Sequence, residues 1–74
     1  MERMTRQREA VLGALREAAR PLSPAEILAA AQRTVPTLGL ATVYRNIRAM
    51  LQEGGLVAVP LPGQADRYAV AAAP

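Results

Sequence analysis

The chain of 74 residues contains no cysteine and no histidine. Without thiols and imidazoles it cannot form disulfides, thiolate or imidazole metal sites, or the commonest pairings of nucleophile and base. Its carboxylates are scattered, and no two are spaced as a general acid and base pair. We therefore expect no catalytic residue, no metal ligand and no cofactor within this chain, and an enzyme is the class of protein that the sequence supports least.

Aromatic residues are also scarce, because two tyrosines are the only ones. The core must then consist mainly of Leu, Val, Ile, Met and Ala, a composition that suits helices. Hydrophobic residues make up 51% of the chain and charged residues 20%, which is typical of a folded soluble domain. A chain of this length forms one domain, 1–74, and buries about 60% of the surface of its unfolded form.

Lysine is absent as well, so all nine cations are arginines, against six acids, and the net charge is +3. Arginine suits bidentate recognition of phosphate and guanine, but this modest excess permits a nucleic-acid partner without requiring one. No apolar run approaches the roughly 18 residues of a membrane span, and the N-terminus lacks the apolar run of a signal peptide. We expect a cytoplasmic protein with no membrane partner.

A first helix is predicted over residues 6–19, where apolar residues recur at helical spacing. Thr5 is the expected N-cap. Arg20 and Pro21 are expected to end the helix.

A second helix, 24–33, has a stronger start signal. Ser23 is the expected N-cap, Pro24 takes the first helical position, and Glu26 at the third position completes a capping box. The following TVPTLG stretch breaks the chain before the next element.

A third helix is predicted over 40–53, and it ends where Gly54 and Gly55 can adopt a left-handed conformation. Two β-prone runs, 56–61 and 67–70, follow. The segment PGQAD joins them as the turn of an antiparallel hairpin.

Three helices followed by a hairpin form the element order of a winged helix-turn-helix, a mainly α fold with a small antiparallel β-hairpin as its two-stranded wing. Pro60 inside the first strand indicates that this strand has an open edge. A hairpin of this size is unstable alone, so we expect it to lie against the helices. A three-helix bundle with a disordered tail is the alternative.

The third helix has one apolar and one basic face. The predicted buried stripe comprises Leu40, Val43, Ile47, Met50 and Leu51. The opposite face comprises Ala41, Thr42, Arg45, Arg48, Ala49 and Gln52. This face has no acid before Glu53, whereas solvated helix faces usually carry both signs of charge. Small residues beside Arg45 and Arg48 suit a helix that lies in the major groove of DNA.

Further candidate contacts lie beside that face. Tyr44 is on its border, where the ring can touch a thymine methyl or a phosphate, or simply cover apolar surface. Arg3, Arg6 and Arg8 cluster near a helix start, where the dipole favours acids. They suit phosphate contact or an arm in the minor groove, unless they form a solvated run. Arg67, just past the turn, is a candidate for a wing contact with the DNA backbone.

From about Thr5 to Val70 the chain resembles the N-terminal DNA-binding domain of the ferric uptake regulator (Fur) family, bacterial metal-responsive repressors. The matching segments are TRQREAVLGAL, PLSPAEIL, LGLATVYRNIRAMLQEGGLV and RYAV. Among them, LATVYRN followed by an apolar-spaced helix and GLV is a specific signature.

The resemblance implies a winged helix whose third helix enters the major groove of an A/T-rich palindromic operator. By position it implies contacts from Tyr44 and Arg45, with Thr42 close by. It also implies a phosphate contact from Arg8 and a position for Arg3 near the minor groove. The implied partner is double-stranded DNA. We expect a homodimer on DNA only through the metal-sensing C-terminal domain that this chain lacks, or through another chain.

Two positions depart from the family pattern. The family commonly places a histidine just before the capping box and a glutamate just after the last strand's tyrosine, and both serve a hinge metal site. Pro21 and Ala69 take these positions here. A second hypothesis is a winged helix that docks on a protein partner without binding DNA. Acids or large apolar groups on the outward face of the third helix would indicate it, and that face has neither.

Overall fold

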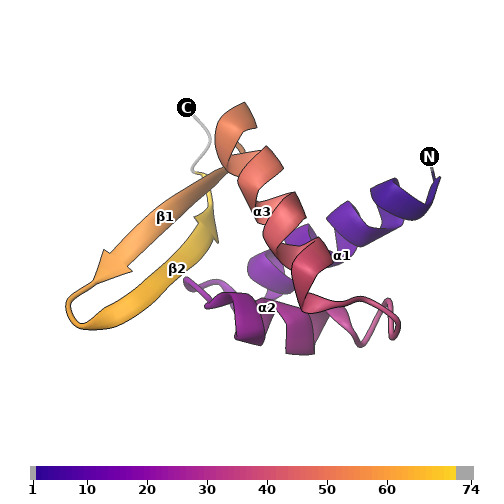
Figure 1. The fold of residues 1–74 in the computed structure, drawn as a ribbon, viewed down its shortest axis with the longest axis horizontal. Coiled ribbons are helices and arrows are strands. Elements are labelled where there is room, and N and C mark those ends of the chain that lie inside the picture. The colour runs from indigo at the N-terminus through magenta and orange to yellow at the C-terminus, as the bar shows by residue number, and fades with distance from the viewer. Residues whose placement is uncertain (1, 72–74) are drawn as a thin grey trace.

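The computed structural model describes the backbone of residues 2–71 and the side chains of residues 5–71. Its elements are α1 (Glu2–Ala18), α2 (Pro24–Ala31), α3 (Leu40–Glu53), β1 (Leu56–Leu61) and β2 (Gln64–Val70). The helices pack together, and the antiparallel β1–β2 hairpin extends away from them (Figure 1). The predicted fold class, a winged helix-turn-helix, is confirmed.

The hydrophobic core is built from aliphatic side chains of all three helices and the hairpin. Its largest fully buried side chains are those of Val11, Ile27, Val43 and Met50. Leu56 at the start of β1 joins the same cluster. Among the described side chains, no polar or charged one is buried. The core therefore holds the inner face of α3, while the outer face of this helix remains accessible.

The first helix begins earlier than the sequence predicts. Because α1 starts at Glu2, Thr5 lies inside the helix and is not its N-cap. The residues before Thr5 are good helix formers, and an acid in the first turn is favoured by the helix dipole, so the helix extends past the candidate cap. Arg3 and Arg6 consequently lie on helical backbone rather than on an N-terminal arm.

The end of α1 also differs from the prediction by one residue. Ala19 has a left-handed backbone with φ of 54°, and its N–H donates to the carbonyl of Leu15 at 3.2 Å. A left-handed conformation costs a residue with a Cβ roughly 1–2 kcal/mol, and glycine is the usual residue at such a helix end.

Replacing Ala19 by glycine is expected to raise the free energy of unfolding by about 1 kcal/mol, because glycine removes this strain. Urea denaturation followed by circular dichroism measures the change. Ala29→Gly, at an exposed position inside α2, is the matched control and should lower stability by about as much. If the Ala19→Gly variant is no more stable than the wild type, the backbone of Ala19 is not strained as argued.

The predicted capping box at the start of α2 is present. The Ser23 Oγ accepts a hydrogen bond from the Glu26 N–H at 3.2 Å, and the Glu26 Oε1 accepts one from the Ser23 N–H at 2.9 Å. Both interactions join residues three positions apart, so the start of α2 depends only on local sequence.

The second helix ends at Ala31, two residues before the predicted end at Arg33. Residues 32–34 form a turn in which the Arg33 N–H donates to the carbonyl of Ala30. The Gln32 side chain donates to the carbonyl of Leu38 at 2.9 Å. This bond ties the α2–α3 loop to the residues just before α3 and so helps to position that helix.

The third helix covers the residues that the sequence indicates, Leu40–Glu53, and Gly54 ends it with φ of 83°. Leu40 is not part of the buried stripe, however, because its side chain is 42% exposed. Leu38, in the preceding loop, is buried instead. Leu40 is the first helical residue, and the chain enters the helix by burying Leu38, so Leu40 projects outward.

The hairpin turn is tighter than predicted. β2 begins at Gln64 rather than at residue 67, because only Pro62 and Gly63 separate the two strands. Gly63 has φ of 72°, and a tight turn with proline at its first central position and a positive φ at the second favours glycine there.

One edge of the hairpin is anchored to the helical part of the chain. The Leu22 N–H donates to the Tyr68 carbonyl at 2.9 Å, and the Tyr68 N–H donates to the Leu22 carbonyl at 2.8 Å. This bridge occupies the outer edge of β2. Within the described residues, no strand pairs with the outer edge of β1. Pro60 in β1 has no N–H to donate, and the open edge that it predicts is present.

Candidate nucleic-acid interface

The outward face of α3 is exposed and basic. Arg45 and Arg48 are both exposed, and neither guanidinium forms an ion pair or hydrogen bond with another residue in the described part of the chain. No acid precedes Glu53 on this helix. Because their donors have no partner among the described side chains, these two arginines are available to an anionic ligand.

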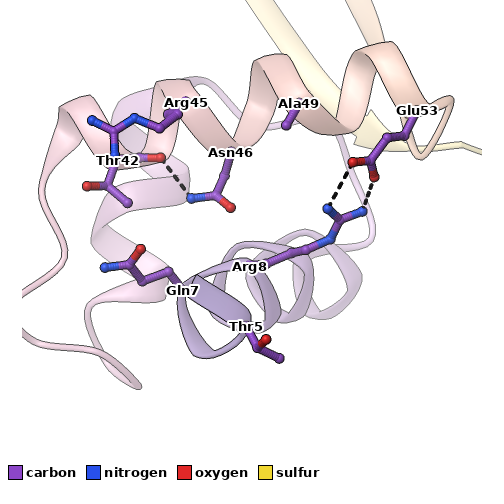
Figure 2. A pocket seen from close by; sticks show the side chains of 8 residues that line it. All are labelled: Thr5, Gln7, Arg8, Thr42, Arg45, Asn46, Ala49 and Glu53. Atoms are coloured by element: carbon purple, nitrogen blue, oxygen red, sulfur yellow. Dashed lines mark hydrogen bonds and ion pairs between the residues drawn. The ribbon is translucent and has the colours of Figure 1, made fainter. Parts of the chain in front are cut away.

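A cleft of about 350 Å³ lies between α1 and α3 (Figure 2). It is lined by Thr5, Gln7, Arg8, Thr42, Arg45, Asn46, Ala49 and Glu53. Thr42 and Arg45 lie toward one end, and Arg8 and Glu53 lie at the other. The structure therefore brings three predicted contact residues, Thr42, Arg45 and Arg8, to one depression.

Arg8 is already engaged by an acid of the same chain. Its Nη1 donates to the Glu53 Oε2 at 3.3 Å, and its Nη2 donates to the Glu53 Oε1. The hydrogen bond between them raises the pKa of the Arg8 guanidinium and lowers the pKa of the Glu53 carboxyl. The two residues are 45 positions apart, so sequence reasoning missed this pair, and no local pattern indicates it.

Asn46 faces the cleft, and its Nδ2 donates to the carbonyl of Thr42 at 2.9 Å (Figure 2). This side chain therefore bonds to its own helix. Val43 and Ile47, which flank Asn46 in the sequence, are buried in the core, but Asn46 is not.

The remaining predicted contacts lie outside the cleft. Tyr44 is 46% exposed and is not among the partly buried side chains that pack on the core, and its contact with DNA stays a prediction. Arg48 follows it by four positions on the same side of α3. Arg3 is in the first turn of α1, but its side chain lies outside the described residues, so its contact stays a prediction.

Arg67 forms an ion pair with Glu26 of α2. Its Nη1 donates to the Glu26 Oε1 at 2.5 Å, and its side chain is 27% exposed. Arg20 is also near, with its Nη2 at 3.9 Å from the Glu26 Oε2. The structure does not bring Arg67 to the outward face of α3. In this conformation it ties β2 to the start of α2.

Acidification is expected to weaken the interactions of Glu26 with Ser23 and Arg67, and so to lower the stability of the domain. The pKa of Glu26 is lowered from 4.5, first by the hydrogen bond from the Ser23 N–H and also by Arg67. A carboxyl with a lowered pKa in the folded state stabilises the protein above its unfolded pKa, and this contribution is lost as the pH falls through the folded pKa. The free energy of unfolding in urea should therefore fall as the pH drops from about 5 through the lowered pKa of Glu26.

The Glu26→Gln variant should show a shallower fall over the same pH range, because glutamine completes a capping box without titrating. Glu17→Gln is the control, since Glu17 is exposed and its only ion-pair partner among the described residues, Arg33, is 4.0 Å away. This control should keep the wild-type slope. A Glu26→Gln slope equal to that of the wild type would contradict the expected contribution of Glu26.

Pro21 and Ala69, which take the family's hinge-ligand positions, line one hollow of about 300 Å³ beside the end of α1. Neither side chain has a nitrogen, oxygen or sulfur donor. Within the described residues, no group of three or more His, Cys, Asp or Glu side chains is placed to hold a metal ion. The described residues, with Pro21 and Ala69 at the two ligand positions, therefore do not fit the hinge metal site that the resemblance implies.

A protein-family model described as the ferric uptake regulator family matches residues 2–74. The chain belongs to this family. The resemblance carried by LATVYRN and the neighbouring segments is thus confirmed, and the ferric uptake regulator family is one of transcriptional regulators. A comparison with curated protein sequences finds no match.

Solved structures of three regulator proteins have the same fold. The Campylobacter jejuni peroxide stress regulator matches with a TM-score of 0.81 and 28% identity, over 92% of this chain and 50% of that one. The Helicobacter pylori ferric uptake regulator, described as having three functional metal-binding sites, matches with a TM-score of 0.81 and 26% identity, over 92% and 45%. The Francisella tularensis regulator, at 23% identity and a TM-score of 0.75 over 86% and 49%, supports the fold alone.

The chain thus spans about half the length of these regulators. The metal sites reported for the Helicobacter pylori protein are properties of that protein. No helix in the described part of this chain is both long and apolar enough to cross a membrane.

Proposed function

We propose that this chain is the DNA-binding domain of a cytoplasmic transcriptional repressor, and that α3 reads an A/T-rich palindromic operator from the major groove. Tyr44, Arg45 and Arg48 contact the DNA from the exposed side of this helix, and Thr42 lies close to the bases. Arg8 contacts a phosphate. Membership of the ferric uptake regulator family and the winged-helix fold support this role.

One observation carries the proposal. The exposed face of α3 combines two arginines that have no partner among the described residues with small side chains and no acid before Glu53. The exposed face of α1 is different, because it mixes both signs in Arg6, Glu9 and Arg16. Unpaired guanidiniums can bind guanine edges or phosphates bidentately, and small neighbours allow the backbone to approach the groove.

Affinity of the single domain should be low. A palindromic operator is read by two recognition helices related by a two-fold axis, so one domain occupies one half-site. A dimer links the two half-sites and converts the second binding event into an intramolecular one. The domain is therefore expected to bind its operator tightly only when it is dimerised.

The experiment titrates labelled DNA with the chain alone and with the chain fused to a dimeric coiled coil. The duplexes are an A/T-rich palindrome, selected from random sequences with the fusion, and a scrambled duplex of the same composition. We expect the fusion to prefer the palindrome by about tenfold or more, and binding of both duplexes to weaken steeply with salt. If neither form prefers the palindrome, the DNA-reading role is wrong, and a protein-docking winged helix becomes the better hypothesis.

A further inference from the structure

Glu53 is the only acid of α3, and it closes one end of the α1–α3 cleft (Figure 2). Both of its carboxylate oxygens accept hydrogen bonds from the terminal nitrogens of Arg8. The Arg8 side chain is 40% exposed and the Glu53 side chain 52%. The pair therefore forms at the surface, at the opposite end of the cleft from Arg45, where solvent and ligands can reach it.

A carboxylate and a phosphate bind the same part of an arginine side chain. Each presents two oxygens to the planar fork of N–H donors. Glu53 consequently occupies the two nitrogens that a phosphate would approach end-on. Its negative charge also lies beside the position that such a phosphate would take, so the two anions exclude one another at Arg8.

The pair is not needed to hold the helices together. Buried apolar side chains of both helices, among them Val11 of α1 and Ile47 of α3, belong to the same core cluster. An exposed ion pair adds little to stability beside such a core. Its effect should instead appear where Arg8 is required for another contact.

We propose that Glu53 competes with DNA phosphate for Arg8 and thereby lowers the affinity of the domain for every duplex. This inference rests on the proposed function, and it identifies Glu53 as a residue that weakens DNA binding. Phosphate contacts are independent of base sequence. The competition therefore reduces binding to operator and random DNA by the same factor and leaves the preference between them unchanged.

The experiment measures DNA affinity of the Glu53→Gln variant in the coiled-coil fusion. We expect the dissociation constants for the palindromic and scrambled duplexes to fall by the same factor, about two- to fivefold at low salt. The gain should shrink at high salt, because both the ion pair and the repulsion between Glu53 and phosphate are screened. Glu53→Ala, which also removes the charge, should give the same result.

Two controls separate this competition from a general charge effect. Glu17→Gln makes the same change of charge on α1, nine residues from Arg8 and therefore on the opposite side of that helix. Its gain should be clearly smaller. In an Arg8→Ala background, Glu53→Gln should also give a smaller gain, because the residue for which Glu53 competes is missing. Thermal unfolding confirms that each variant is folded.

Three outcomes would overturn the inference. An equal gain with and without Arg8 would show that Glu53 acts only through net charge. Unchanged or weaker binding by both Glu53 variants, while the wild type binds, would remove the competition and leave the proposed function standing. If neither the wild type nor the Glu53 variants bind any duplex at low salt, the inference and the proposed function are both wrong.

Discussion

Replacing Arg45 by alanine is expected to remove most of the preference of the coiled-coil fusion for its palindromic operator. A bidentate contact between arginine and a base edge contributes about 1–3 kcal/mol of discrimination. Arg45 is exposed and has no ion-pair partner among the described residues, so its removal breaks no contact that stabilises the fold. The loss should therefore appear in operator affinity, while binding to the scrambled duplex changes far less.

The Arg8→Ala variant provides the comparison that separates loss of base reading from loss of a phosphate contact. Arg8→Ala should weaken binding to both duplexes alike and reduce the slope of log K against log salt by about one unit, as expected for one lost phosphate contact. Arg16→Ala removes an exposed arginine of α1 that does not line the cleft and serves as the charge-matched control. Equal losses of operator and scrambled binding in the Arg45 variant would exclude a base-reading role for this side chain.

Replacing Ile27 by alanine is expected to lower the free energy of unfolding by about 2–5 kcal/mol. Ile27 belongs to α2, is fully buried, and is among the largest side chains of the core. Truncation leaves a cavity, because the side chains around it can relax only partly. A domain of this length has a total stability of roughly 4–11 kcal/mol, so this one substitution should remove a large share of it.

Urea denaturation followed by circular dichroism measures this loss. Ile27→Val, which removes a single methyl group, should cost only about 0.5–1.5 kcal/mol. Leu40→Ala is the control for an apolar residue outside the core, and it should change stability by less than about 0.5 kcal/mol. If Ile27→Ala were no more destabilising than Leu40→Ala, the assignment of Ile27 to the centre of the core would be wrong.

Several elements are predictable from the sequence because their interactions are local. The capping box joins Ser23 to Glu26, and Gly54 ends α3 by adopting a conformation that other residues resist. The start of α1 was predicted wrongly for a related reason. Thr5 is a good cap residue, but its neighbours are good helix formers, and local preference alone does not choose between capping and continuing a helix.

The outward face of α3 was also predictable, since a period of 3.6 residues separates Arg45 and Arg48 from Val43 and Ile47. Leu40 shows the limit of this periodicity. Its angle around the helix suits burial, but it is the first residue of the helix and Leu38 takes the buried position. A helical period specifies a direction around the axis and does not specify where along the axis the core ends.

The sequence by itself determined the order of the elements, the bounds of α3 and the side of α3 that faces outward, because these depend on residues within a few positions of one another. Only the tertiary structure decided the partners of Arg8 and Arg67, which pair with Glu53 and Glu26. Those partners are 45 and 41 positions away. They meet through the packing of α1 against α3 and through the bridge between Tyr68 of β2 and Leu22, just before α2, and the packing of whole elements sets that geometry.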